Sequence, residues 1–221
     1  MKTTEEKFRP SAVIFDMDGL MLDTERITIP LWDEAGKKFG YRIPFDTVQK
    51  MVGISVQDAR DVLFKEYGDD FPYEKIRNEF KLLCKREYEN GIPHKKGLVF
   101  LLDHLTAAKI PFGVATSARR DAAMENLAKA GILEKFAAIT GGDEVANGKP
   151  APDIFLLAAK KLGAPPSACA GFEDSTAGLR GLHAAGIRSV FIRDLIDPPQ
   201  EVLDTVWRIC GDLFEAAELF E

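Results

Sequence analysis

Polar residues stand at four points of the sequence beside or shortly after an apolar run, and their types suit phosphate chemistry. The four groups are Asp16 with Asp18, Thr116 with Ser117, the loop sequence Gly148-Lys149-Pro150, and Glu173 with Asp174. Each group alone has an ordinary explanation, because Asp, Ser and Thr commonly cap helices and a single loop lysine is usually solvated. All four together favour a shared site.

Carboxylates that converge on one site repel each other unless a cation lies between them. All-oxygen ligands favour a hard divalent ion, chiefly Mg²⁺, and Mg²⁺ in turn indicates a phosphorylated substrate. A carboxylate can attack phosphorus once a metal, a lysine and backbone N–H groups screen the phosphoryl charge. The residues therefore predict magnesium-dependent phosphoryl transfer.

Backbone N–H groups for phosphate oxygens are expected in two places. The chain after Asp16 passes through Met17 and Asp18 to Gly19, whose permissive backbone allows the turn. Ser117 is predicted to stand at the start of a helix, where its N–H and the helix dipole favour an anion.

The elements that must position these residues alternate regularly between strand and helix. The predicted strands are Ala12–Phe15, Phe112–Ala115, Ala137–Thr140, Cys169–Phe172 and Ser189–Ile192, and the predicted helices are Leu98–Lys109, Arg119–Ala130, Asp153–Leu162 and Thr176–Ala185. This alternation predicts an α/β fold with a Rossmann-like, doubly wound parallel sheet. Ligands of such sheets bind at the carboxyl ends of the strands, where the four polar groups are expected.

A second domain is expected as an insertion. Residues 23–92 carry charged stretches with helical periodicity and predict about four helices, so residues 1–22 and 93–221 form the sheet-containing core. Hinge motion is expected at the two crossings, near residues 22–23 and 91–96. The last stretch, residues 197–221, predicts a short edge strand at Thr205–Cys210 and a terminal helix.

Composition narrows the class of protein. The 221 residues are 46% hydrophobic and 29% charged with a net charge of −6, so we expect a globular protein that binds neither nucleic acid nor membrane. Three cysteines without metal-ligand spacing suit a reducing compartment. With no export signal or membrane-spanning run recognisable, we expect a cytoplasmic protein, as a monomer or weak dimer.

The motifs resemble those of the haloacid dehalogenase superfamily. The matching sequences are Asp16-Met17-Asp18-Gly19, Thr116-Ser117, Gly148-Lys149-Pro150-Ala151-Pro152-Asp153 and Gly171-Phe172-Glu173-Asp174-Ser175. The helical insertion resembles the C1 cap of that superfamily. Within it, the sequence from Asp18 to Glu25 is similar to the beta-phosphoglucomutase-like branch, which also holds many capped phosphatases.

The resemblance implies a role for each matching residue. Asp16 would attack phosphorus and become an aspartyl phosphate, while Asp18 would act as general acid and base. Thr116, Lys149 and the N–H groups of Met17 and Ser117 would hold or screen the phosphoryl group. The implied Mg²⁺ ligands are Asp16, the Asp18 backbone carbonyl, Asp174 and, directly or through a second shell, Glu173.

A phosphatase and a phosphomutase are the two main alternatives. A carboxylic acid at Asp18 suits phosphoester cleavage, which needs a proton for the leaving oxygen, whereas halide needs none. Beta-phosphoglucomutases grip a second phosphate with a cap Arg and a His, whose positions here hold Val56 and Thr28. The sequence therefore favours a phosphatase. Phosphonate cleavage by a cap lysine and a non-catalytic binding role are weaker alternatives.

Substrate specificity is expected to come from the cleft between cap and core. Arg119 and the cap loop from Met51 to Ser55, including Gly53 and Ser55, are the candidate substrate-binding residues there. The expected substrate is a small phosphorylated metabolite. Sugar phosphates, nucleoside monophosphates and glycolate-type phosphates all fit the sequence.

Overall fold

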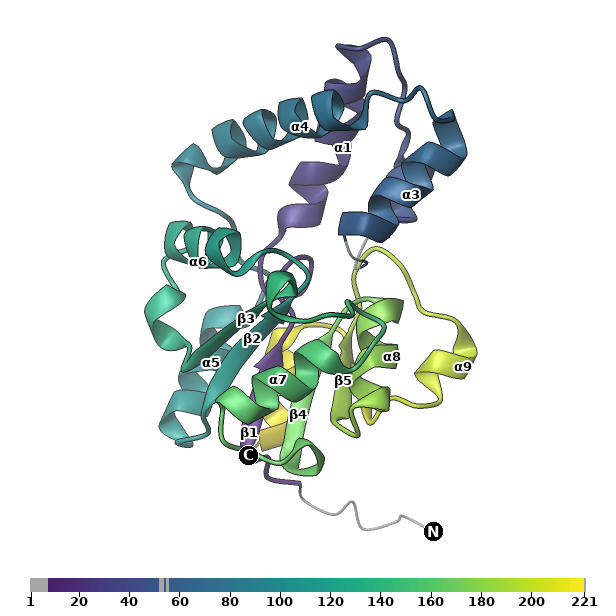
Figure 1. Ribbon diagram of the computed structural model, residues 1–221. Helices are drawn as coiled ribbons and strands as arrows, with labels where there is room; N and C mark the ends of the chain where they lie inside the picture. Colours follow the sequence, from purple (N-terminus) through teal and green to yellow (C-terminus); the bar gives the residue numbers. More distant parts are fainter. Residues whose placement is uncertain (1–7, 52–53, 55, 221) are drawn as a thin grey trace.

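The computed structural model describes residues 8–51, 54 and 56–220, and centres on a parallel sheet of six strands (Figure 1). The strands are β1 Ala12–Phe15, β2 Phe112–Thr116, β3 Ala138–Gly141, β4 Cys169–Glu173, β5 Arg188–Ile192 and β6 Arg208–Cys210. Their order is β3-β2-β1-β4-β5-β6. The predicted Rossmann-like, doubly wound sheet is confirmed.

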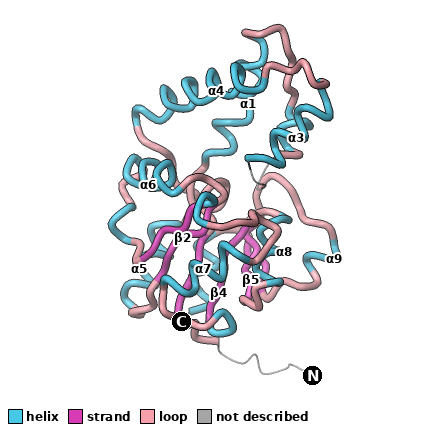
Figure 2. Tube along the Cα trace, viewed as in Figure 1, coloured by secondary structure: helices cyan, strands magenta, loops and turns pink. Residues whose placement is uncertain are grey.

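Helices cover both faces of the sheet (Figure 2). They are α5 Leu98–Ala107, α6 Arg120–Lys129, α7 Asp153–Lys161, α8 Thr176–Ala184, α9 Gln200–Leu203 and α10 Leu213–Ala217. Side chains of β1 alternate between the two cores, as expected of a strand buried on both faces. Val13 and Phe15 pack with α5, α6 and α10, whereas Ala12 and Ile14 pack with α7 and α8.

The C-terminal part differs in detail from the prediction. The edge strand begins at Arg208 rather than Thr205, because the preceding residues close the turn after the unpredicted helix α9. The N–H groups of Thr205 and Val206 donate to the carbonyls of Val202 and Leu203, so they cannot extend the β6 ladder. The terminal helix is present as α10.

The inserted segment, residues 24–90, contains four α-helices in its described part. They are α1 Thr24–Lys37, α2 Phe45–Gln49, α3 Val56–Tyr67 and α4 Tyr73–Glu87. Leu31, Ala35, Leu63, Ile76 and other apolar residues form a separate hydrophobic cluster among these helices. Figure 1 shows the helices of this segment as a group apart from the sheet. The division into domains at residues 22–23 and 92–93 stays a prediction.

The two chain crossings between the helical segment and the sheet lie side by side. Leu22 and His94 form an antiparallel bridge, the Asp23 N–H donates to the Pro93 carbonyl at 2.9 Å, and the Lys95 N–H donates to the Met21 carbonyl at 2.9 Å. Main-chain hydrogen bonds therefore join both crossings into one narrow connection. Among the described helices, none is long and apolar enough to span a membrane.

Four charged residues close an ionic ring around this connection. Lys95 Nζ lies 3.0 Å from Asp23 Oδ1 and 2.6 Å from Asp194 Oδ2, while Arg26 contacts the same two carboxylates at 3.3 and 3.1 Å. The Lys95 and Asp194 side chains are only 15% and 8% exposed. Asp194 follows β5 in the core, whereas Arg26 lies in α1, so the ring ties the helical segment to the core.

We predict that Lys95→Met destabilises the protein through this ring. Both acids would lose their most buried cation, and the free energy of unfolding in urea should fall by about 2 kcal/mol, somewhat less than for a fully buried pair. Lys38→Met is the matched control, because Lys38 is 59% exposed and pairs with Glu79 at the surface. The Lys38→Met change should lower the free energy of unfolding by less than about 1 kcal/mol. Equal effects of the two variants would contradict a special role for the ring.

Candidate active site

The turn after β1 presents two carboxylates at the carboxyl end of the central strands. Asp16 is the first residue beyond β1, and its N–H donates to the Phe172 carbonyl of β4 at 3.0 Å. Gly19 has φ 85°, and a Cβ there would lie 2.3 Å from Asp174 Oδ2. Only glycine therefore allows both the turn and the close approach of Asp174.

Lys149 lies between the nucleophile candidate and a second acid. Its side chain is almost fully buried, and Nζ donates to Asp16 Oδ1 and Glu173 Oε1, both at 2.5 Å. The Nζ atom also lies 4.9 Å from the centre of the Phe155 ring. Burial alone would lower the pKa of Lys149, but the two carboxylates outweigh it and raise that pKa above its ordinary value. Lys149 is therefore a fixed positive charge.

Glu173 is held by the start of α8. Its Oε2 accepts hydrogen bonds from the Ser175 hydroxyl at 2.9 Å and the Ser175 N–H at 3.2 Å. Ser175 Oγ in turn accepts from the Gly178 N–H, which caps the helix. A Cβ on Gly178 would lie 1.9 Å from the Glu173 carboxyl carbon, so this glycine makes room for the acid.

Asp16, Glu173 and Asp174 could together hold a metal ion. Each offers one carboxylate oxygen, and these oxygens lie within 4.8 Å of one another. Burial raises the pKa values of Asp16 and Asp174 well above their ordinary range, and neighbouring carboxylates add to the effect. One lysine does not offset three buried acids, and an all-oxygen donor set suits a hard divalent cation such as Mg²⁺. The donor chemistry fits the ion expected from the sequence.

Asp18 interacts with the helical segment through Thr24 and with the core through Thr116. Its Oδ1 accepts a hydrogen bond from the Thr24 hydroxyl at 3.0 Å. Burial raises the pKa of Asp18, while hydrogen bonds from Thr24 and Thr116 oppose the shift. A carboxyl group with a raised pKa can carry a proton at higher pH than usual, which suits a general acid.

Thr116 and Ser117 end the neighbouring strand. Thr116 is buried at the last position of β2, and its Oγ1 accepts from the Ala118 N–H at 3.1 Å. Ser117 does not begin a helix, because α6 starts only at Arg120. The Ser117 N–H belongs to the loop before α6, so the predicted help from a helix dipole at this residue is wrong.

The remaining predicted residues fall in different surroundings. The Met17 side chain is fully buried in the core, so only its backbone can face a phosphate. Arg119 is exposed, contacts Asp121 at 3.2 Å and Asp143 at 3.7 Å, and lines a cavity of about 310 Å³ with Ser117 and Lys149. Gly53 and Ser55 lie outside the described residues.

Glu25 is a site residue to which sequence reasoning gave no role. It is 9% exposed, and one of its carboxylate oxygens lies within 4.8 Å of oxygens from Asp174 and Asp194. Burial, followed by the nearby Asp194, raises the pKa of Glu25 to about 7. Glu25 ends the motif that begins at Asp18, but only the three-dimensional structure brings it to Asp174.

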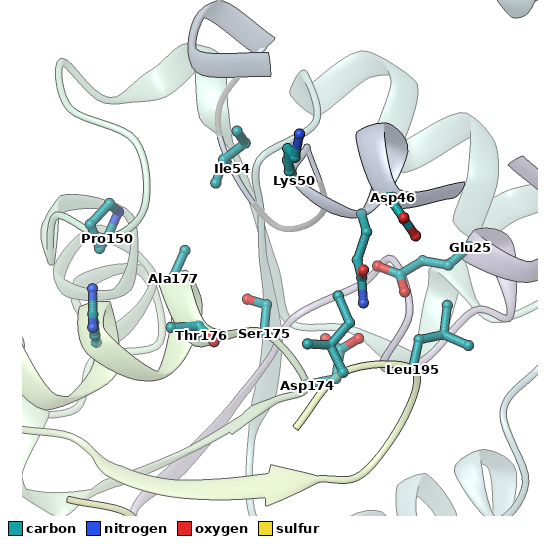
Figure 3. Close-up of a pocket in the computed structure, with 13 residues that line it drawn as sticks. Glu25, Asp46, Lys50, Ile54, Pro150, Asp174, Ser175, Thr176, Ala177 and Leu195 are labelled. Carbon is teal, nitrogen blue, oxygen red and sulfur yellow. The ribbon is translucent and has the colours of Figure 1, made fainter. Parts of the chain in front are cut away.

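A cavity of about 680 Å³ opens between α2 and the core beside this cluster. Figure 3 shows Glu25 and Asp174 on its walls, together with Asp46 and Lys50 from the helical segment and Ser175 from the start of α8. Both parts of the chain therefore contribute walls to the space next to the candidate metal ligands.

Comparisons with known proteins agree with the motifs. Residues 13–192 match the family model described as haloacid dehalogenase-like hydrolase. A probable pseudouridine-5'-phosphatase of Drosophila melanogaster is 34% identical over 189 residues, covering 82% of this chain and 80% of the relative. The beta-phosphoglucomutase of Bacillus subtilis is 31% identical and covers 91% of each chain. The crystal structure of beta-phosphoglucomutase from Clostridium difficile superimposes with a TM-score of 0.80, at 25% identity over 96% of this chain and 97% of that one.

We predict that Lys149→Met exposes the repulsion among the buried acids. Without added metal, the free energy of unfolding should fall by about 3–5 kcal/mol, the usual result of leaving buried charges unpaired. Added Mg²⁺ should then raise the thermal unfolding midpoint more than in the wild type, because the ion becomes the principal positive charge among the carboxylates. Differential scanning fluorimetry with EDTA or Mg²⁺ measures both effects.

Lys135→Met is the control for this experiment. Lys135 forms a surface pair with Asp103 at 2.7 Å, so its removal should cost less than about 1 kcal/mol and leave the Mg²⁺ response unchanged. A Lys149→Met protein that behaves like this control would show that the buried lysine does not balance the acids.

Proposed function

The chain belongs to the haloacid dehalogenase-like hydrolases, and we propose that it is a magnesium-dependent phosphatase acting on a small phosphorylated metabolite. The observation that carries the proposal is Asp16, held at 2.5 Å by Lys149, with Asp18 two residues further on. The first carboxylate suits attack on phosphorus and the second suits proton transfer. Relatives described as phosphatases of pseudouridine 5'-phosphate and of phosphorylated carbohydrates support the same reaction class.

The first chemical step forms an aspartyl phosphate. An Asp16 carboxylate oxygen attacks phosphorus, the bond between phosphorus and the leaving oxygen breaks, and Asp18 gives its proton to that oxygen. Lys149 offsets negative charge on Asp16 and the phosphoryl oxygens, while the Thr116 hydroxyl and the N–H groups of Met17 and Ser117 orient those oxygens.

The second step returns the enzyme to its starting state. Asp18, now a carboxylate, takes a proton from water as that water attacks phosphorus, and the bond from phosphorus to Asp16 breaks to release phosphate. Asp16, Asp174, Glu173 and the Asp18 carbonyl would hold Mg²⁺. When bound, this ion neutralises charge on the phosphoryl group.

The helical segment is proposed to act as a cap over this site. Residues 23–92 would close on the core to exclude bulk water, with motion at the crossings near residues 22–23 and 91–96.

We also propose a cytoplasmic protein that works as a monomer or weak dimer. Free thiols at Cys84, Cys169 and Cys210 are compatible with a reducing compartment.

A phosphomutase of the beta-phosphoglucomutase type is the second candidate, because the similar proteins described above include two of that name. Such an enzyme must hold a second phosphate while the first returns to the sugar. Val56, at the position of the cap arginine, is an exposed apolar residue at the start of α3, and Thr28 stands at the position of the histidine. Neither can supply positive charge, so hydrolysis is favoured.

We predict that Asp16→Asn lowers phosphate release by about 1,000-fold or more, as expected for loss of a nucleophile. The amide keeps the size of the carboxyl group but cannot attack phosphorus. The measurement is phosphate release from a panel of small phosphoesters with Mg²⁺, and Asp103→Asn, an exposed change on α5, is the control.

Folded Asp16→Asn protein with wild-type phosphate release would rule out the proposed reaction. Mutase activity has a separate readout, because phosphorylated enzyme supplied with beta-glucose 1-phosphate would then yield glucose 6-phosphate. We expect inorganic phosphate as the main product instead.

A further inference from the structure

A small cavity lies directly beside the proposed general acid. Its volume is about 160 Å³, and the residues that line it are Asp18, Thr24, Glu25, Thr28, Ile29, Trp32, Val48 and Met51. In the proposed reaction Asp18 gives its proton to the leaving oxygen, so the leaving group must lie next to Asp18. The inference below rests on that proposed function, and the cavity is then the place where the leaving group is recognised.

Much of the cavity wall is apolar and held in place by the core of the helical segment. Trp32 stacks on Phe80 with ring centres 4.2 Å apart and planes 17° from parallel. Val48 and Met51 are buried in the same hydrophobic cluster, and Ile29 packs against it. A fixed tryptophan and three aliphatic side chains offer contact to an apolar face of a ligand.

The charged groups on this wall are all acidic. Asp18 and Glu25 are carboxylic acids, and none of the residues found to line the cavity is Lys, Arg or His. Arg119 lines a different cavity, where Asp143 is also on the wall and contacts it at 3.7 Å. A second anionic group bound in this cavity would therefore lose its hydration without gaining a cation, which disfavours its binding.

We propose that this enzyme takes monophosphate esters of neutral alcohols, with one ring-sized, partly apolar unit of the leaving group bound among Trp32, Val48 and Met51. Because the described residues of its wall include no cation, this cavity excludes leaving groups that would place a carboxylate or a second phosphate in it. The reaction balances as ester plus water giving a neutral alcohol plus phosphate.

The volume supports a single unit of this size. A cavity of about 150 Å³ lined by apolar side chains accommodates benzene, so one six-membered ring fills a space of this kind. Glu25 lines both this cavity and the one of about 680 Å³, so a longer alcohol would pass Glu25 into the larger space. Lys50 and Arg180 line the larger space, so the exclusion of anions applies to the small cavity alone. A neutral two-ring alcohol is compatible with the inference, whereas an ester that would place a carboxylate or a second phosphate in the small cavity is not.

The test compares matched substrates that differ in the charge of the leaving group. The first pair is glycerol 1-phosphate, which is neutral in its leaving group, with 3-phosphoglycerate, which is anionic. The second pair is benzyl phosphate with 4-carboxybenzyl phosphate. The wild type with Mg²⁺ should show kcat/KM at least about tenfold higher for the neutral member of each pair, since an anion in this cavity would lose hydration without gaining a cation.

Thr28→Lys adds a cation to the cavity wall and should reduce this preference by about fivefold or more, through better use of the anionic members. Asn78→Lys is the matched control, because it adds the same charge at an exposed position of α4 that does not line the cavity. It should leave the ratio unchanged. Arg119→Ala should change both members of a pair equally.

Three results would overturn the inference while leaving the phosphatase proposal intact. They are equal or better use of the anionic esters by the wild type, an unchanged ratio in folded Thr28→Lys protein, and a selective loss of anionic substrates in Arg119→Ala. Absence of phosphate release from every ester in the panel would overturn the phosphatase proposal and this inference together.

Discussion

The buried ammonium group of Lys149 is the contact on which the rest of this site depends. Three carboxylates meet here, those of Asp16, Glu173 and Asp174. One oxygen of each lies within 4.8 Å of the others. Such a group is unstable in a protein interior without positive charge. Lys149 contacts two of them at 2.5 Å and leaves the third without a close cation. That residual negative charge is what a divalent cation would neutralise.

The topology explains why these residues meet. In the strand order β3-β2-β1-β4-β5-β6, the chain first runs from β1 through β2 to β3 on one side of β1. It then crosses to the other side of β1 and runs from β4 through β5 to β6. The crevice at the carboxyl ends of β1 and β4 is the topological switch point of the sheet, the usual ligand site of such folds. Asp16 follows β1, and Glu173 ends β4, so the fold itself brings the candidate metal ligands together. The ionic ring of Asp23, Arg26, Lys95 and Asp194 sets the position of α1 and hence of Thr24 and Glu25 beside them.

Sequence patterns were informative where local rules decide the structure. The apolar run Ala12–Phe15 has one way to be buried in an α/β sheet, and the polar residues that follow each strand had to meet at one edge. Three features depended on tertiary contacts instead. Glu25 at the start of α1 lies near Asp174 only in the folded chain, and Ser117 lies outside a helix that begins at Arg120. The strand β6 is shortened by the turn after α9. Periodicity and motif spacing carry no information on any of these.

The central claim is that Asp16 forms a covalent bond to phosphorus, and trapping that species tests it most directly. Enzyme mixed with a hydrolysable phosphoester and Mg²⁺ would be quenched in acid within milliseconds, digested and analysed by mass spectrometry. The account predicts a phosphorylated peptide that contains Asp16 and disappears as phosphate is released. Burst-free turnover with an unmodified Asp16 peptide at every time point, or phosphate on a different residue, would contradict it.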